Sequence, residues 1–490
     1  MTSPRIPNIA EQIALHGRQR PTQPALVHGA QTLDYRTLDA EITRRAAWLQ
    51  GRELKPGAVI GIALADSIEH VLMLYAVARA GGVLLPVDCR WKPFEKQRVA
   101  EHFGAALVMV EPGAAFEGVP CVEVGPGWLA EVARAEPRVP FPDGDRGLVM
   151  SLSSGTTGRP KGPMLSHQRL VSRFYTQWAD LGFGSRERYV NATPLYFGGG
   201  RTFTLSTLYA GGTVVLCPPP YTPEELAAEI GRTQGSLLFL VPTLLRRLLA
   251  CDAATLAPLR GMKSLISSGS ALTREERVQI RETICPNFVE YYASTEGGGV
   301  TVLTPEDQLR HGDSVGRPAF GVEVQVVDEA HRPVATGDTG RIRYRSASVA
   351  EGFHGDPEAS KEAFRDGWFY PGDLGALNDE GYLFLKGRSK DMIIRGGVNI
   401  YPQEIEAVLM DHPAVLEAAA VGWPSREFNE EVAAFVIRKG EVEEAELVAL
   451  CRQALAPYKV PRRVFLVDEL PRNSLGKVVK TELVARLDPL

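Results

Sequence analysis

One glycine-rich segment decides the fold of this chain: Ser153-Ser154-Gly155-Thr156-Thr157-Gly158-Arg159-Pro160-Lys161-Gly162. It follows an apolar stretch at 147–152 that predicts a buried strand. It precedes a predicted helix with Ser166 as N-cap and Leu170 and Phe174 on one face. Glycines let backbone N–H groups approach an anion, four hydroxyls add hydrogen-bond donors, and Lys161 adds a mobile positive charge. The strand, loop and helix together predict a polyphosphate site in an α/β protein.

The loop differs from the common nucleotide-binding motifs. A Walker A loop has Gly directly before its Lys and Ser or Thr directly after it, whereas Pro160 and Gly162 occupy those places here. The GxGxxG pattern of dinucleotide-binding folds is also missing. The sequence therefore disfavours a P-loop NTPase and a Rossmann dinucleotide site.

The same strand and helix alternation extends on both sides of the loop. Residues 67–80 predict an amphipathic helix that Gly81 and Gly82 end, and 83–87 predict a short buried strand. Further strands are predicted at 213–216, 237–241, 264–267, 322–327 and 341–345, and helices near 402–411 and 443–456. Alternation of this kind indicates βαβ units and a mostly parallel sheet.

The predicted fold class is α/β, with a large N-terminal domain and a small α+β C-terminal domain. The large domain, 1–387, is expected to contain layered, mostly parallel sheets with helices. Its expected subdomains are about 1–146, 147–314 and 315–387. The second domain is expected at 388–490, because Gly387 follows the last predicted strand and charged residues follow it.

Composition excludes several classes of protein. The 490 residues are 44% hydrophobic and 23% charged, which is typical of a soluble globular protein, and the net charge of −5 gives no overall basic field for nucleic acid. The six cysteines form no CxxC pair, and the nine histidines show no paired metal-ligand spacing. No signal peptide or membrane-spanning run is visible. We expect a cytoplasmic monomer or homodimer with reduced thiols.

At the glycine-rich loop the chain resembles the adenylate-forming superfamily, which includes acyl-CoA synthetases, luciferases and the adenylation domains of peptide synthetases. Only Pro163 departs from that family's phosphate loop, where an aliphatic residue is usual. The resemblance implies a nucleotide-binding role for Ser153, Ser154, Gly155, Thr156, Thr157, Gly158 and Lys161. It gives Thr156 and Lys161 a catalytic role as well. The family resemblance further implies a small β-barrel-like subdomain in the large domain and a mobile C-terminal domain.

Two further segments resemble the family's adenine and phosphate contacts. Tyr292-Ala293-Ser294-Thr295-Glu296 is similar to the Tyr-Gly-x-Thr-Glu segment, with Ala293 in place of Gly. By resemblance, Tyr292 packs on the base, Thr295 hydrogen-bonds a phosphate, and Glu296 is catalytic and binds Mg²⁺. The small-residue loop at 267–272 is similar to the one that lines the adenine and acyl slots. The nucleotide site is thereby extended to Gly269, Ser270, Tyr291, Tyr292, Ala293, Thr295 and Glu296.

The C-terminal third carries three more matching segments. The turn at 368–374 resembles the family's ribose-binding turn, with Asp373 as the expected ribose anchor. The segment at 387–400 resembles the family's hinge region. By that resemblance Arg388 contacts the ribose, Lys390 is the hinge, and Gly396 and Gly397 border the CoA pantetheine tunnel. Residues 471–477 resemble the motif that carries the catalytic lysine, here Lys477.

The resemblance implies a two-step reaction with ATP, Mg²⁺ and coenzyme A. A carboxylate attacks the α-phosphorus of ATP, and a thiol then attacks the acyl-AMP and releases AMP. A free-standing acyl-CoA ligase is one interpretation. The alternatives are an acyl or aryl adenylating enzyme that loads a carrier-protein phosphopantetheine, and a non-catalytic member of the fold. Luciferase-type oxidation stays open, although no residue favours it.

The acyl slot is expected to contain Tyr196, Phe197, Gly198, Gly269, Gly297 and Gly298. Phe197 stands where peptide-synthetase relatives carry Asp and many acyl-CoA synthetases carry His. Burying an ammonium against this aromatic wall would be costly, so amino acids are poor candidates. The glycine runs 198–200 and 297–299 are expected to widen the slot. An aryl acid or a medium-chain fatty acid is the predicted substrate.

Overall fold

The computed structural model describes residues 7–52, 54–136, 141–142, 144, 146–152, 161–270, 272–396, 398–472 and 477–490. The chain divides into two compact units. The first unit comprises Met1–Val324 and Tyr344–Phe369, and the second comprises Gln325–Arg343 and Tyr370–Leu490. A rigid-body boundary near residue 390, and the subdomain limits within 1–387, stay predictions.

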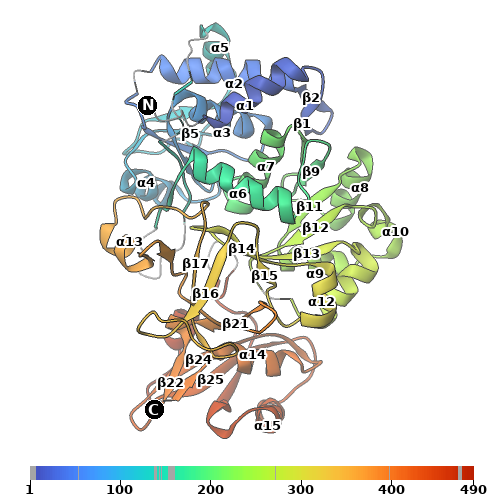
Figure 1. Cartoon of the computed structure of the whole chain (residues 1–490), viewed down its shortest axis with the longest axis vertical. Helices are drawn as coiled ribbons and strands as arrows, with labels where there is room; N and C mark the ends of the chain where they lie inside the picture. The colour runs from blue at the N-terminus through green and yellow to red at the C-terminus, as the bar shows by residue number, and fades with distance from the viewer. Residues whose placement is uncertain are drawn as a thin grey trace. The chain divides into compact units, whose positions relative to one another are not determined.

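The first unit contains a nine-stranded sheet (Figure 1). Its strands, in spatial order, are β15 (Arg317–Pro318), β14 (Gly298–Leu303), β13 (Phe288–Ser294), β12 (Ser264–Ser267), β11 (Leu237–Leu240), β9 (Arg188–Asn191), β10 (Thr213–Leu216), β1 (Pro24–His28) and β2 (Gln31–Asp34). The six strands from β13 to β1 are parallel. Only β15, β14 and β2 pair antiparallel, so the predicted mostly parallel sheet is confirmed.

A second sheet of the first unit has six strands. In spatial order they are β6 (Cys121–Glu123), β5 (Ala105–Val110), β3 (Val59–Ala63), β4 (Val83–Pro86), β7 (Gly147–Met150) and β8 (Met164–Ser166). Only the β7–β8 pair is antiparallel. The two sheets interleave along the sequence, because β1 and β2 join the nine-stranded sheet while β7 and β8 join this one.

Helices cover these sheets. In the first unit they are α1 (Ile9–Gln19), α2 (Tyr35–Gln50), α3 (Ile68–Ala80), α4 (Pro93–His102), α5 (Pro126–Arg134), α6 (His167–Asp180), α7 (Gly198–Ala210), α8 (Pro223–Thr233), α9 (Pro242–Leu249), α10 (Ala253–Leu256), α11 (Arg274–Gln279), α12 (Pro305–His311) and α13 (Pro357–Ala363), with the short turns η1 (Ala257–Leu259) and η2 (Ile280–Ile284). The N-cap predicted at Ser166 is confirmed, since its side chain accepts from the Arg169 backbone N–H. The Ser67 side chain caps α3 in the same way, by accepting from the His70 backbone N–H. Gly81 ends α3 with φ of 79°, a left-handed conformation that favours glycine.

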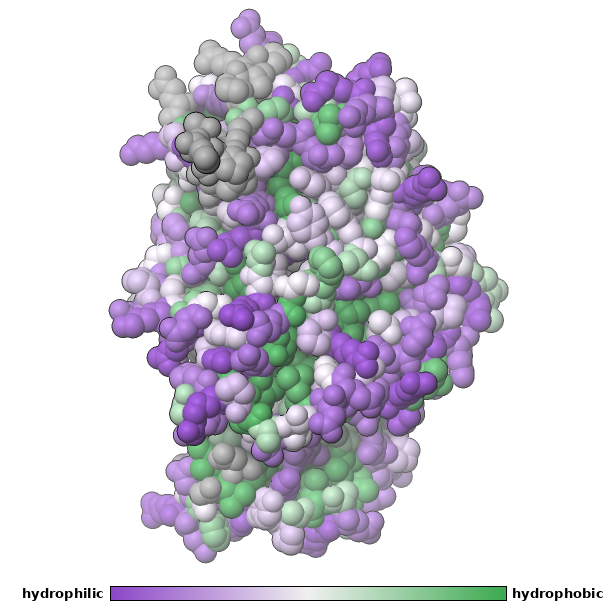
Figure 2. All heavy atoms as spheres, in the orientation of Figure 1, coloured by the Kyte–Doolittle hydropathy of each residue, from purple (hydrophilic) through white to green (hydrophobic). Residues whose placement is uncertain are grey.

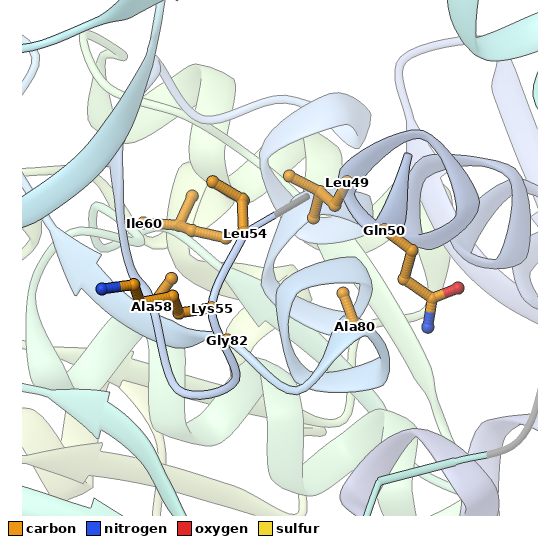
Figure 3. A pocket seen from close by; sticks show the side chains of 8 residues that line it. All are labelled: Leu49, Gln50, Leu54, Lys55, Ala58, Ile60, Ala80 and Gly82. Carbon is orange, nitrogen blue, oxygen red and sulfur yellow. The ribbon is translucent and has the colours of Figure 1, made fainter. Parts of the chain in front are cut away.

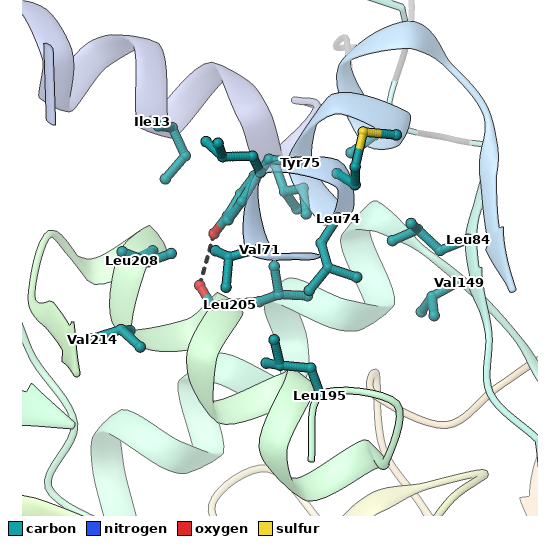
Figure 4. Packing of buried hydrophobic residues seen from close by; sticks show 14 of the residues in the cluster. Ile13, Val71, Leu74, Tyr75, Leu84, Val149, Leu195, Leu205, Leu208 and Val214 are labelled. Atoms are coloured by element: carbon teal, nitrogen blue, oxygen red, sulfur yellow. Dashed lines mark hydrogen bonds between the residues drawn. The ribbon is translucent and has the colours of Figure 1, made fainter. Parts of the chain in front are cut away.

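Both faces of the central strands of the nine-stranded sheet are buried, which explains why these strands are apolar. Along β11, Leu237 and Phe239 belong to one core, while Leu238 and Leu240 belong to another. Figure 4 shows the first core, where α3 packs on α7 and the Tyr75 hydroxyl donates to the Leu205 carbonyl at 3.0 Å. Leu195 is buried in this same core. The backbone that leads into the expected acyl segment is therefore anchored by hydrophobic packing.

The second unit contains a five-stranded sheet with helices. Its strands are β22 (Ile393–Arg395), β23 (Val398–Ile400), β24 (Val415–Ser425), β25 (Asn429–Arg438) and β26 (Arg463–Val467), and its helices are α14 (Pro402–Met410), α15 (Glu444–Ala454) and α16 (Lys480–Val484), with the turns η3 (Ser389–Asp391) and η4 (Pro457–Lys459). The helices predicted near 402–411 and 443–456 are confirmed. Strand β20 (Asp373–Leu377) pairs with β21 (Leu383–Arg388) in the same unit.

The division between the units falls within β16 (Glu323–Val327) and β17 (Gly340–Arg345). The last residues of β17 pair with β19 (Trp368–Phe369), which pairs with β18 (Phe364–Arg365), all in the first unit. The first residues of β17 pair with β20 in the second unit. The strands predicted at 322–327 and 341–345 are thus present.

On the face seen in Figure 2, hydrophilic residues are spread over the surface with apolar areas between them. Within the described ranges, no helix is long and apolar enough to cross a membrane. All six cysteines are free thiols. A cavity of about 120 Å³ lies between α2, α3 and β3 (Figure 3), and its lining includes Leu49, Leu54, Ile60 and Ala80. None of the predicted site residues that the structure describes lines this cavity.

Candidate functional site

The glycine-rich loop connects β7 to β8. Residues 153–160 lie outside the described residues, so the positions of Ser153, Ser154, Gly155, Thr156, Thr157 and Gly158 stay predictions. The loop ends are fixed, because Val149 pairs with Leu165 and the Gly162 carbonyl accepts from the His354 backbone N–H at 2.8 Å. The Lys161 ammonium lies 4.8 Å from the centre of the Phe353 ring. This contact holds the lysine at the loop exit, and within the described ranges its ammonium pairs with no carboxylate.

The topology brings three predicted segments to one edge of the nine-stranded sheet. Strands β9, β12 and β13 are parallel members of this sheet, so the segments after their carboxyl ends meet at the same edge. Tyr196–Gly198 follow β9, Gly269 and Ser270 follow β12, and Thr295 and Glu296 follow β13. Such an edge is where ligands bind in open α/β sheets. The structure thus groups the predicted acyl and adenine residues of the first unit.

Glu296 lies in the tight turn between β13 and β14. The turn is shaped by Ser294, whose Oγ accepts from the Gly297 backbone N–H at 2.8 Å and contacts the Tyr344 hydroxyl at 2.5 Å. Tyr291, Tyr292 and Ala293 lie on β13, with Tyr291 buried and the other two half-buried. Among the residues that the structure describes, no cation pairs with the half-buried Glu296 carboxylate. That carboxylate is available to a metal ion.

Two buried arginines support these segments, and the sequence analysis missed both. Arg173 of α6 donates to the carbonyls of Glu296 at 2.7 Å, Thr295 at 3.1 Å and Ser348 at 3.2 Å. Burial lowers the pKa of Arg173 to about 10. An arginine beside Leu170 and Phe174 on the apolar face of a predicted helix was the available signal.

Arg201 of α7 joins the residues just before the glycine-rich loop to the acyl segment. Its Nη2 donates to the Ser151 Oγ at 2.7 Å, and its Nη1 donates to the carbonyls of Leu195 at 3.2 Å and Tyr196 at 3.1 Å. It is 2% exposed, and burial lowers its pKa to about 9, so it stays charged at neutral pH. One side chain therefore fixes the last residues before the loop and the backbone of the acyl segment.

The acyl segment itself is aromatic. The rings of Tyr196 and Phe197 meet edge to face with centroids 4.8 Å apart, and the Arg90 guanidinium lies 5.2 Å from the Tyr196 ring centre. Behind them, Asp66 Oδ1 accepts from the Leu195 backbone N–H at 2.9 Å. Burial raises the pKa of Asp66 to about 7. No periodic pattern in the sequence indicated this buried carboxyl.

The glycines near the site mostly make room for packing, which corrects the expectation that both runs widen the slot. A Cβ added at Gly297 would lie 2.2 Å from the Tyr344 hydroxyl, and one at Gly299 would lie 2.0 Å from the Tyr291 hydroxyl. Gly298 lies against Arg173, Gly199 against Phe239, and Gly200 against backbone carbonyls. Only at Gly198, among these six, would a Cβ meet no described atom within 4 Å. Open space is thus confined to Gly198.

The second unit holds the remaining predicted residues. Asp373 and Arg388 form an ion pair with an Nε–Oδ1 distance of 2.8 Å, so the two predicted ribose contacts lie together. Lys390 is exposed in η3, and Gly396 is exposed between β22 and β23 with φ of 56°. Lys477 is exposed, while Gly397 and residues 473–476 lie outside the described residues. The roles of these residues stay predictions.

The chain matches two family models and many known proteins. The model of the AMP-binding enzyme matches residues 13–354, and that of the AMP-binding enzyme C-terminal domain matches residues 404–477. A feruloyl-CoA synthase from Amycolatopsis sp is 31% identical over 478 residues, covering 96% of this chain and 97% of that protein.

Two solved structures are similar over almost the whole chain. ATP-bound MatB from Rhodopseudomonas palustris has a TM-score of 0.90 and 30% identity, covering 97% of this chain and 98% of its own. The o-succinylbenzoate CoA synthetase MenE from Bacillus subtilis, in complex with its acyl-adenylate OSB-AMP, has a TM-score of 0.88 and 26% identity, covering 98% of each chain. Together with the family models, these similarities show that the chain belongs to the AMP-binding enzyme family.

Proposed function

We propose that this protein is an AMP-forming acid–thiol ligase that converts an aryl carboxylic acid to its CoA thioester. The observation that carries the proposal is the grouping of Tyr196–Gly198, Gly269–Ser270 and Thr295–Glu296 at one edge of a parallel sheet. The residues that bind the acid, the adenine and the phosphates must line one site, because the acid's carboxylate has to reach the α-phosphorus of the bound ATP.

In the first step the acid's carboxylate attacks the α-phosphorus, and pyrophosphate leaves. Several negative charges gather there, so catalysis depends on positioning and electrostatic stabilisation of phosphoryl oxygens. Lys161 and Lys477 supply ammonium groups for this purpose. Thr156 and Thr295 supply hydroxyl donors, and the Asp373 carboxylate accepts from the ribose hydroxyls.

The Glu296 carboxylate fits a magnesium ion. It is an oxygen ligand without a cationic partner among the described side chains, and Mg²⁺ prefers one or two carboxylates together with substrate phosphates and water. Within the described ranges, no group of three His, Cys, Asp or Glu side chains could hold a metal. The ion, when bound, would neutralise charge on the phosphates.

In the second step the CoA thiol attacks the acyl carbonyl and AMP leaves. The thiol needs access that Lys477 would block, so we propose that the domain from residue 388 onward rotates about Lys390. Gly396 and Gly397 would then border the pantetheine chain. Gly396 is exposed and carries no side chain, which suits the passage of a thin thiol-bearing chain.

An aryl acid fits the acyl segment better than an aliphatic one. The Tyr196 and Phe197 rings offer edges and faces for an aromatic partner, and open space lies beside them at Gly198. Feruloyl-CoA synthase and o-succinylbenzoate CoA synthetase, both similar to this chain, are named for aromatic acids. A medium-chain fatty acid is the second candidate, since the segment carries few polar side chains.

The test is a screen of pyrophosphate release with ATP and Mg²⁺ over hydroxycinnamic, benzoic and C2–C16 aliphatic acids, with free CoA or a holo carrier protein as acceptor. We expect aryl acids with CoA to give AMP and an aryl-CoA thioester. Release of ADP and orthophosphate would contradict the proposal. A thioester formed only on the carrier protein would instead identify a carrier-loading enzyme.

A further inference from the structure

The buried guanidinium of Arg173 holds the turn that carries Glu296. Its three hydrogen bonds reach carbonyls 122, 123 and 175 residues away in the sequence, at Thr295, Glu296 and Ser348. The Glu296 carbonyl also accepts from the Ala350 backbone N–H at 2.9 Å. One helix side chain therefore ties the Thr295–Glu296 turn to the segment at 346–350.

The charge of Arg173 has no carboxylate partner among the described residues. Its polar contacts are all backbone carbonyls, although its side chain is buried. Arg45 shows the usual alternative, because this equally buried arginine pairs with Glu41 and Glu69 at 2.6 Å each. Burying a charge without an ion-pair partner costs free energy, and a bound anion near Arg173 would reduce that cost.

The surroundings of Arg173 fix its side chain in one place. The aliphatic stem packs on Gly298, where an added Cβ would lie 3.1 Å from Cγ and Cδ. The phenols of Tyr344 and Tyr291 and the carboxylate of Glu296 lie near enough to favour its charged form. An anion brought to the Glu296 turn would thus be stabilised by a fixed positive charge behind the backbone.

We propose that Arg173 is a positioning residue for Mg·ATP: its guanidinium orients the Thr295–Glu296 turn, and its charge, which forms no ion pair with a described carboxylate, is balanced by the bound polyphosphate. The inference rests on the proposed nucleotide-dependent function. It assigns to α6 a role in nucleotide and metal affinity, whereas Tyr196–Gly198 of the expected acyl slot follow β9 and share no described hydrogen bond with Arg173.

The test compares Arg173→Gln, Arg173→Lys and the wild type in full-length protein. Gln keeps a donor but removes the charge, whereas Lys keeps the charge and loses the planar fork. We expect Arg173→Gln to weaken ATP binding, measured by calorimetry with saturating Mg²⁺, by about 30-fold or more, and Arg173→Lys by about 3- to 10-fold. The Mg²⁺ concentration for half-maximal pyrophosphate exchange should rise, with the acid's KM changed less than about 3-fold.

Arg45→Gln is the matched control, since it removes a buried guanidinium distant in sequence from the site. It should lower the melting temperature without changing ATP affinity or the Mg²⁺ requirement. If Arg173→Gln does not fold, Arg173→Lys provides the test. The inference then requires that the ATP affinity of this variant falls while its KM for the acid stays unchanged. Equal loss of affinity for ATP and acid, or unchanged ATP affinity in both variants, overturns the inference.

Failure of this inference is distinguishable from failure of the proposed function. If the wild type binds ATP and exchanges pyrophosphate while the Arg173 variants match it, only the positioning role is wrong. If the wild type binds no ATP in the calorimeter, the proposed function and this inference both fall. Binding of ATP without turnover of any acid leaves the calorimetric comparison to decide the role of Arg173.

Discussion

Asp373 and Arg388 stand directly opposite each other on β20 and β21 and form an ion pair with an Nε–Oδ1 distance of 2.8 Å. Arg388 also donates to the Pro371 carbonyl at 3.2 Å, so it braces the turn that precedes Asp373. The pair places a carboxylate and a guanidinium side by side, each with capacity for further hydrogen bonds.

The ion pair predicts coupled effects on ATP affinity. Asp373→Asn should raise the KM for ATP by about 10- to 100-fold, because a charged acceptor for two ribose hydroxyls is lost. Arg388→Ala should have a smaller effect on ATP affinity. The fold-change in the double variant should be smaller than the product of the fold-changes in the two single variants. Calorimetric titration with ATP and with AMP checks this. Fully additive effects would show that the two residues act independently.

Lys477 predicts a separation of the two half-reactions. Lys477→Ala should slow adenylation, followed by pyrophosphate exchange, by about 10²–10³-fold because a positioned cation is lost from the transition state. Thioester formation from pre-made acyl-AMP and CoA should stay within about 3-fold of the wild type. Lys480→Ala is the control, since its ammonium pairs with Glu406 at 2.6 Å. Equal loss in both half-reactions would refute the proposed division of labour.

Asp66 predicts a pH dependence of stability. Burial raises its pKa to about 7 in the folded protein, so the folded state holds a proton that the unfolded state releases near pH 4. This proton uptake stabilises the folded protein, so the free energy of unfolding is highest below pH 4. It falls by about 4 kcal/mol in total as the pH rises to 7. His70, with Nδ1 3.9 Å from Asp66 Oδ1, stays neutral here because burial lowers its pKa to about 4.

The measurement is the free energy of unfolding of Asp66→Asn and of the wild type by urea titration between pH 4 and 8. Asparagine keeps an oxygen to accept from the Leu195 backbone N–H but does not titrate. The stability of the variant relative to the wild type should increase from pH 4 to 7 and level off above that. A difference independent of pH would show that the folded and unfolded pKa values of Asp66 coincide.

Gly198 predicts control of acyl size. Gly198→Val should lower kcat/KM for a hydroxycinnamic acid by about 10-fold or more and affect short aliphatic acids less, because added methyl groups fill the open space. Gly299→Ala is the contrasting variant. Its Cβ would overlap the Tyr291 hydroxyl, so its melting temperature should fall without a change in acid preference. A uniform loss for all acids in Gly198→Val would place the acyl slot elsewhere.

The sequence by itself determined the local elements and the motif chemistry. The N-cap at Ser166, the end of the helix at Gly81, and the strands at 213–216 and 264–267 depend on residues three or four positions apart or on a short apolar run. The motifs identified the family for the same reason, since each is a short contiguous segment. None of these features needs knowledge of a distant residue.

Only the tertiary structure decided which charged groups are buried and which glycines leave open space. The hydrogen bond from Arg173 to the Glu296 carbonyl spans 123 residues, and that from the Leu195 backbone N–H to Asp66 spans 129. The sequence also did not predict which strands share a sheet. Strand β1 pairs with β10, although the glycine-rich loop lies between them in the sequence. Such contacts depend on how separate segments pack, and packing is a property of the assembled core that local pattern does not encode.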